Sequence, residues 1–318
     1  MAAHPAPTPD DLVSRPLGPK DGPATWRFLE AGGIRNVFVA SQLWRGALSQ
    51  KSADGTPELW GAYAGEDLRA VLFYGQGGLA VPAARHPDDI AALGPVLARR
   101  AERLRALIGS LDLVDALLPF VEAAGARTRV RVRELFMEVD ASTLDPSSSL
   151  PELRAATLDD LDLVTRAASR AHLEEMGDDP FARNPEAFLG RVARMILEER
   201  VYVLRQDDTL VFKAELSALC PIGAQVSGVY TDPEHRNRGI ARRGTVEISR
   251  RVLETAPAVC LFVREDNPPA LRAYERGGFR HACDYRTLFF EDPSLHRRPR
   301  AESRPAPWPP SESPRGAR

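Results

Sequence analysis

A basic segment that contains a glycine lies between a strand-like run and a helix-like run, and this junction constrains the fold most. The strand-like residues are AQVSGVYT (224–231), and DPEHRNRGIARRG (232–244) leads into a helix that we expect to reach about Thr255. A helix N-terminus presents unpaired N–H groups and about half a positive charge, and glycine lets a ligand approach the backbone. The junction is therefore a candidate phosphate site, with a solvated turn as the alternative.

Arginines concentrate at this junction. Around Gly239 and in the helix after it stand Arg236, Arg238, Arg242, Arg243 and Arg251. The whole chain has 318 residues and a formal net charge of -2, so this concentration is local. A guanidinium group pairs with phosphate oxygens in a forked geometry, so these arginines fit a phosphate site, and the solvated turn stays open as the alternative.

The second half of the chain alternates strand-like and helix-like runs. Thr157 is a predicted N-cap, with Asp160 in the reciprocal position of a capping box. Asn267 is a second predicted N-cap, followed by two prolines. We predict strands at 153–156, 201–206, 209–219, 224–231, 258–263 and 280–291, and helices at 157–174, 185–199, 239–255 and from 267. The predicted order is β-α-α-β-β-β-α-β-α-β.

Two motifs about 30 residues apart carry a family resemblance. GVYTDPEHRNRGIARRG (228–244) followed by NPPALRAYERGGF (267–279) resembles the paired signature motifs of the GNAT acyl-CoA-dependent N-acyltransferases. The wider pattern, HLEEMG followed by VFKAELSALC and AQVSGVYTDPEHRNRGIA, is similar to that of a group of two-part bacterial GNAT proteins. The resemblance implies an α/β (α+β) fold with tandem, mixed and mostly antiparallel sheets flanked by helices. One departure is Ala241, where many members have glycine; a methyl group there leaves the anion site intact.

The resemblance also implies a coenzyme site. In the family the first motif cradles the pyrophosphate of coenzyme A, so acetyl-CoA is the expected co-substrate, without a metal. The implied contacts in this chain are Val229, Tyr230, Thr231, Arg236, Asn237, Arg238, Gly239, Ile240, Ala241, Arg242, Asn267 and Tyr274.

Acyl transfer to an amine needs a proton donor, oxyanion donors and a base. The resemblance implies Tyr274 as the donor to the thiolate; the alternative is a core tyrosine. It implies a backbone N–H at Val229 or Tyr230 for the oxyanion. Glu215 is a candidate base because it lies in an apolar strand, where burial raises a carboxyl pKa; an ion pair with Lys213 is the alternative. Glu175, with Glu174 beside it, is a further candidate base or part of a solvated helix end.

The first half resembles the second half in sequence, which predicts a duplication. GLAVPAARHPDDIA (78–91) aligns without gaps under residues 228–241, and Phe120 aligns near Tyr274. Asp88 and Asp89 take the places of Arg238 and Gly239, so this half is expected to bind no coenzyme. We expect residues 1–10 to be disordered, 11–140 to form a degenerate GNAT-like domain, 141–150 a linker, 151–292 the catalytic domain and 293–318 a disordered tail. Chance similarity between α/β segments is the alternative to duplication.

The composition limits partners and compartment. Three cysteines without regular spacing predict small buried hydrophobes rather than disulfides or a metal site. No run approaches the ~20 apolar residues of a membrane span, and the expected location is cytoplasmic. We predict an N-acyltransferase that acts on a small-molecule or peptide amine, without nucleic acid or membrane, as a monomer or weak homodimer. The alternatives are a non-catalytic acyl-CoA sensor or scaffold, and an acyltransferase that uses aminoacyl-tRNA, which the net charge disfavours.

Overall fold

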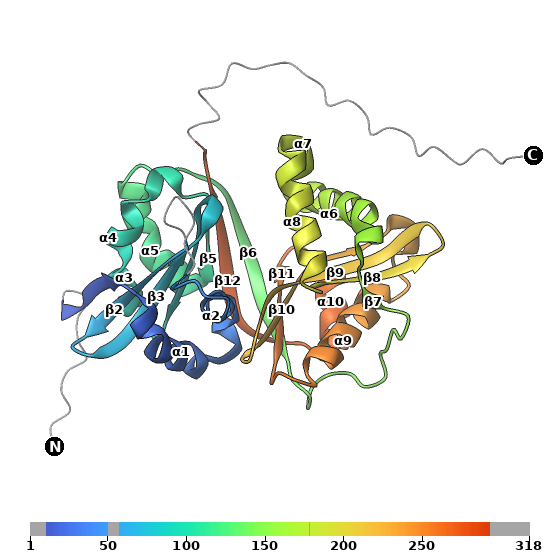
Figure 1. Cartoon of the computed structure of the whole chain (residues 1–318), viewed down its shortest axis with the longest axis horizontal. Helices are drawn as coiled ribbons and strands as arrows, with labels where there is room; N and C mark the ends of the chain where they lie inside the picture. Colours follow the sequence, from blue (N-terminus) through green and yellow to red (C-terminus); the bar gives the residue numbers. More distant parts are fainter. Residues whose placement is uncertain (1–10, 50–56, 178, 293–318) are drawn as a thin grey trace, which may run out of the picture.

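A computed structural model describes residues 11–49, 57–177 and 179–292. The expected disordered ends, 1–10 and 293–318, lie outside these ranges. One mixed sheet of 12 strands runs through the described chain in the order β1-β2-β3-β4-β5-β12-β6-β11-β10-β9-β8-β7, with helices on both faces (Figure 1). The predicted fold class, a mostly antiparallel mixed sheet flanked by helices, is confirmed.

The two halves repeat one element order. The first half comprises β1 (Val13–Pro16), α1 (Gly22–Ala31), α2 (Val37–Trp44), β2 (Glu58–Ala64), β3 (Asp67–Tyr74), β4 (Leu79–Ala84), α3 (Pro87–Ala91), α4 (Gly94–Ala98), β5 (Ala106–Ser110), α5 (Leu111–Ala123) and β6 (Thr128–Val139). The second comprises β7 (Arg154–Ala155), α6 (Leu161–Met176), α7 (Pro180–Arg183), α8 (Pro185–Leu197), β8 (Val201–Gln206), β9 (Thr209–Cys220), β10 (Gly223–Thr231), α9 (Ile240–Val252), β11 (Val259–Arg264), α10 (Pro268–Arg276) and β12 (Arg280–Phe290). Apart from α7, the order predicted for the second half is confirmed.

An arginine–aspartate clasp opens each half and strengthens the case for a repeat. Arg15 donates to Asp21 at 2.8 and 3.0 Å, and Arg154 donates to Asp160 at 2.7 and 2.9 Å. Each aspartate also accepts a backbone N–H three residues before it, from Gly18 at 2.8 Å and from Thr157 at 2.9 Å. The second contact is half of the predicted capping box. The two clasps have the same spacing and geometry, as a duplicated segment would.

The last strands of the halves are exchanged. β6, from the first half, pairs antiparallel with β11, and β12, from the second half, pairs antiparallel with β5. β6 and β12 also pair with each other and form the middle of the sheet (Figure 1). Each half is therefore completed by a strand of the other.

The core crosses between the halves. α2 packs against β9, and one apolar cluster joins Val37 with Ala218, Cys220 and Cys260. Arg45, after α2, also forms an ion pair with Glu198, after α8, at 2.7 Å. The cysteines form no disulfide; Cys220 and Cys260 are buried and Cys283 is half-buried, so the first two fill the core as predicted.

Candidate functional site

The strands β10 and β11 separate after a short parallel contact. Only residues 224–226 of β10 pair with residues 259–261 of β11, although both strands continue. Beyond that point Ser227 opposes Glu215 and Tyr230 opposes Lys213, so Gly228 and Val229 together face one residue of β9. Such a bulge disrupts the ladder locally and leaves a backbone N–H unpaired. The predicted oxyanion donor Val229 thus lies at an opening in the sheet.

The predicted anion loop joins β10 to α9 at this opening. Gly239 is the N-cap of α9 and has φ +73°, and Asn237 has φ +63°. Both residues occupy the left-handed region, which glycine and asparagine tolerate best. The N–H groups of the first turn, from Ile240 to Arg242, have no acceptor within the helix. Loop and helix therefore provide several amide donors beside the gap between the strands.

The arginines of the loop divide by their partners. Arg243 donates to Ser149 O and Arg251 to Leu153 O, both at 2.7 Å, and these two hold the connection between the halves. Arg236 donates to Glu174 at 2.8 Å. Arg238 makes no side-chain hydrogen bond or ion pair within the described ranges and is exposed. It is one of two arginines left for a ligand.

Arg242 is the other, and two further residues that were predicted to contact the coenzyme also have unpaired polar atoms. Buried atoms without a hydrogen-bond partner include Arg242 Nε, Tyr230 Oη and Thr231 Oγ1. A buried polar atom without a partner costs about 1–3 kcal/mol, so a polar ligand that bonded to these atoms would recover that energy. Three such atoms in the predicted coenzyme site fit an anion with several oxygens.

Glu215 forms an ion pair with Lys213, which is the alternative left open by the sequence. Lys213 Nζ lies 2.5 Å from Glu215 Oε1, and Arg191 of α8 lies 3.5 Å from the other oxygen. Burial raises the pKa of Glu215, but these two cations more than offset it, and the pKa is lowered from its ordinary value. The expectation of a raised pKa was wrong, because the alternative ion pair with Lys213 forms and Arg191, from another element, adds a second cation.

Glu175 has the property that was expected of Glu215. It lies in the last turn of α6, where the helix dipole disfavours a negative charge. Desolvation raises its pKa, with a smaller contribution from Glu174, although Lys213 and Arg264 act in the opposite direction. Arg264 of β11 also donates to Glu175 O at 3.1 Å and so holds the end of this helix near the opening.

Glu134 is a site residue that the sequence did not reveal. It lies on the exchanged strand β6 opposite Arg264, and it accepts a hydrogen bond from Thr287 of β12 at 2.5 Å. Desolvation raises the pKa of Glu134, and the nearby Glu175 raises it further. Its only signal was a charged residue beside the apolar run LFMEV. Its place follows from the strand exchange, which no local pattern encodes.

Tyr274 and Asn267 both lie on α10. The ring of Tyr274 is buried and packs against Phe279, with 6.0 Å between the ring centroids. Its hydroxyl makes no hydrogen bond to another described residue. Burial, and then the charge of Glu175, raise the pKa of Tyr274, which keeps the phenol protonated. Asn267 accepts from Ala270 N at 3.2 Å and so caps the helix, as predicted.

The first half lacks the anion loop. Two residues, Arg85 and His86, separate β4 from α3, whereas eight residues, 232–239, separate β10 from α9. Asp89 is buried and lies 3.4 Å from Arg69. The ungapped alignment also needs correction: Gly78 precedes β4, so its counterpart is Gly223 at the start of β10, not Gly228.

Among the described residues, no group of three His, Cys, Asp or Glu side chains could hold a metal ion. Within the same ranges, no helix combines the length and the apolar character needed to cross a bilayer.

Part of the chain matches a family model and a curated protein. Residues 211–288 match the family model of FR47-like proteins. Over 203 residues the chain is 28% identical to a mycothiol acetyltransferase of Brachybacterium faecium, in a match that covers 58% of this chain and 60% of that protein. The chain thus spans 60% of the length of this curated relative.

Solved structures share the fold. A GNAT-family acetyltransferase from Colwellia psychrerythraea matches with a TM-score of 0.53 and 10% identity, over 88% of this chain and 100% of that one. A tandem GNAT protein from the clavulanic acid biosynthesis pathway matches with a TM-score of 0.52 and 15% identity, over 88% and 97%. The resemblance to GNAT proteins, drawn above from two motifs, is confirmed, and the tandem arrangement has a precedent.

Proposed function

We propose that this chain, a tandem GNAT protein by its fold, is an N-acyltransferase that takes acetyl-CoA as co-substrate and an amine as acceptor. The observation that carries the proposal is the unpaired Arg242 Nε beside the left-handed Gly239 at the start of α9. Amides, arginines and a helix dipole converge there on one anion-sized position. The mycothiol acetyltransferase relative supports the same activity.

The coenzyme would be held along the opening between β10 and β11. The loop amides from Asn237 to Ala241, with Arg238 and Arg242, would bind the pyrophosphate. The thioester carbonyl would lie at the bulge, where the unpaired N–H of Gly228 or Val229 donates to its oxygen. A backbone donor fixed in advance is the usual way to stabilise a developing oxyanion.

We assign the base to Glu175 rather than Glu215. A primary amine is mostly protonated near neutral pH and must lose a proton before it attacks. Two nearby carboxylates, Glu175 and Glu134, attract the ammonium form, and the raised pKa of Glu175 suits it to accept the proton. Glu215 is already neutralised by Lys213, so its main role is to hold that ammonium group.

Tyr274 would return a proton to the departing thiolate. Its raised pKa makes the phenol a weak acid in the free protein. The same dry environment also raises the pKa of a thiol that leaves beside it, so the transfer stays feasible. The ammonium group thus loses one proton to Glu175 before it attacks. The nitrogen loses a second proton as the tetrahedral intermediate collapses, and this proton balances the one that Tyr274 gives to the sulfur.

The test combines binding and turnover. Acetyl-CoA should stabilise the chain thermally, and free thiol should appear with a pool of amines. Gly239→Asp should abolish both, because it adds a charge against the pyrophosphate. The matched control is Gly65→Asp, since Gly65 also has a positive φ (+60°) and open space around its Cβ position. Stabilisation that survives Gly239→Asp would contradict the proposal, and binding without thiol release from any amine would favour the sensor.

A further inference from the structure

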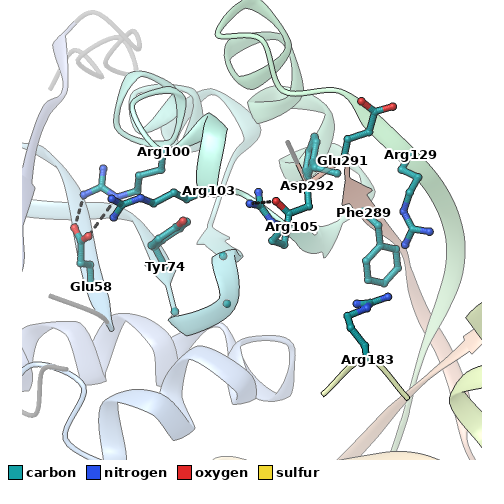
Figure 2. Close-up of a pocket in the computed structure, with 14 residues that line it drawn as sticks. Glu58, Tyr74, Arg100, Arg103, Arg105, Arg129, Arg183, Phe289, Glu291 and Asp292 are labelled. Carbon is teal, nitrogen blue, oxygen red and sulfur yellow. Dashed lines mark hydrogen bonds and ion pairs between the residues drawn. The ribbon is translucent and has the colours of Figure 1, made fainter. Parts of the chain in front are cut away.

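A cavity of about 730 Å³ opens in the first half, near the starts of β4 and β5 and the end of β12. Its lining includes five arginines, which come from three parts of the chain: Arg100, Arg103, Arg105, Arg129 and Arg183. Arg183 belongs to α7 of the second half, so both halves contribute to the cavity. Figure 2 shows Arg129, Arg183 and Phe289 together at one end and Arg100 and Arg103 at the other.

Only part of this positive charge is neutralised within the described chain. Arg100 pairs with Glu58, and Arg105 pairs with Asp292 at 2.7 Å. Arg103 and Arg129, both exposed, form no side-chain hydrogen bond or ion pair with a described residue. The lining holds three carboxylates against five guanidinium groups, so the cavity favours an anion.

The fold itself does not demand these arginines. Gly78 lies so close to the neighbouring segment that a Cβ there would be 2.0 Å from Arg103 O. Gly223, its counterpart in the second half, approaches Ala258 O in the same way, at 2.4 Å. Each half therefore needs a close backbone contact at this corner. In the second half the residue that makes this contact is Ala258, so the contact does not require an arginine. The arginine at this corner belongs to the first half alone.

Two elements connect the cavity with the proposed reaction centre. On β12, Thr287 donates to Glu134, and Phe289, two residues further along the same face, lines the cavity. Two residues of a strand span about 7 Å. On the other side, Glu175 ends α6, and Arg183 of the following helix reaches the cavity. Two separate elements thus lead from the reactive carboxylates to the arginines.

We propose that this arginine cavity binds an oxyanionic group, a phosphate or a carboxylate, at the far end of the amine acceptor. The inference rests on the proposed function, and it narrows the acceptor to amines that carry such a group more than 7 Å from the nitrogen. The amine lies at Glu175 and Glu134, the chain of the acceptor passes Phe289, and the anion pairs with Arg129 at that end of the cavity, while Arg103 attracts it from the other end. Forked pairing with a guanidinium group gives both affinity and orientation.

A series of amines measures this directly. Linear primary amines of increasing length, each ending in a phosphate, a carboxylate or an alcohol, are compared as acceptors with acetyl-CoA. The phosphate or carboxylate series should show a lower KM than the alcohol series, by about tenfold, at one preferred length. The series with the larger advantage identifies the anion. The double variant Arg103→Gln, Arg129→Gln should lose this advantage, whereas Arg131→Gln, an exposed position on the same strand that pairs with Glu122, should keep it.

The outcome is decisive even if no amine is turned over. The long amino phosphate, without coenzyme, is then titrated by calorimetry into the Gly239→Asp chain, in which the loop of α9 no longer competes for the anion. Binding that the double variant loses would support the cavity site while the proposed function fails. Equal KM values for anionic and neutral amines, or an advantage or binding unchanged in the double variant, would overturn the inference.

Discussion

Three glutamates near the opening show that a residue's role depends on its neighbours. Glu215 has cationic partners and a lowered pKa, whereas Glu175 and Glu134 are desolvated and have raised pKa values. The sequence identified Glu215 and Glu175 as candidates because each interrupts or ends an apolar run. It could not rank them, because the ion pair of Glu215 with Lys213 was only one alternative and the approach of Arg191 depends on packing that was unknown.

The pH dependence of the rate distinguishes these glutamates. A base must be ionised, so the rate should fall as the pH drops through the raised pKa of Glu175, above the ordinary glutamate value of about 4.3. Glu175→Gln should remove this acidic limb. Glu134→Gln removes a neighbouring negative charge and should move the limb to lower pH. Profiles of kcat/KM check both; an acidic limb that disappears only in Glu215→Gln would restore Glu215 as the base.

Tyr274 can be tested without disturbing its packing. Tyr274→Phe keeps the buried ring against Phe279 and removes only the hydroxyl, which has no hydrogen-bond partner among the described residues. If that hydroxyl protonates the thiolate, kcat should fall by about 10²-fold while the affinity for acetyl-CoA stays the same. An unchanged kcat, in an assay where the chemical step limits the rate, would reduce Tyr274 to a packing role.

At the scale of elements, the strongest sequence signals were local ones. The capping box at Thr157, the N-cap at Asn267 and the alternating runs located most helices and strands of the second half, because each depends on neighbours within a few residues. Neither arginine–aspartate clasp was predicted, and in the first half Gly18 stands where the capping box of the second half has a threonine. α7 was also missed, because it has only four residues and no periodicity of its own.

The two clasps predict a matched loss of stability in acid. Arg15 lowers the pKa of Asp21 to about 2, and Arg154 lowers that of Asp160 further. A lowered pKa contributes stability above the unfolded value of about 3.9, and that stability is lost as the pH falls toward the folded value. Asp160→Asn, at a fully buried position, should cost about 1–3 kcal/mol at pH 7 and flatten this acid dependence. Urea unfolding at pH 7 and pH 3 measures this acid dependence. If the free energy of unfolding changes between the two pH values as much in Asp160→Asn as in the original chain, the clasp does not cause the loss of stability in acid.

At the scale of the whole molecule, the exchange of β6 and β12 was beyond the sequence. Both strands have the same alternating pattern as any edge strand of either half, and pairing within or across the halves would bury similar surfaces. Only the complete structure shows that Glu134 of the first half lies opposite Arg264 of the second. The first half therefore contributes to the proposed site a residue that the sequence could not name.

Separated halves provide a test of this exchange. Residues 11–145 expressed alone would have β6 without its partner β11 and β5 without its partner β12. Residues 146–292 would have β11 without β6 and β12 without β5. Each fragment should be unstable by circular dichroism and hydrogen exchange, whereas co-expression should restore a 1:1 complex that acetyl-CoA stabilises. Two independently folded fragments would show that each half closes its own sheet.

The stoichiometry of acetyl-CoA follows from comparing the two halves. Both have strands that separate next to a helix, so shape alone would allow two coenzymes per chain. The first half has a two-residue connection between β4 and α3, too short to curve around a pyrophosphate, and Asp89 places a buried carboxylate in the helix that follows. Charges within about 5 Å would cost roughly 1 kcal/mol per pair in a wet site, and more in a dry one.

The missing amides and arginine pairs add a few kcal/mol, so binding to the first half should be weaker by about a thousandfold or more. Isothermal titration should therefore give one acetyl-CoA per polypeptide, and Gly239→Asp should remove it. If the arginine cavity binds the amine substrate, it does not change the number of acetyl-CoA molecules bound per polypeptide. A long amino phosphate should therefore add a second binding event rather than compete with acetyl-CoA. Two coenzymes per chain would show that the first half is not degenerate.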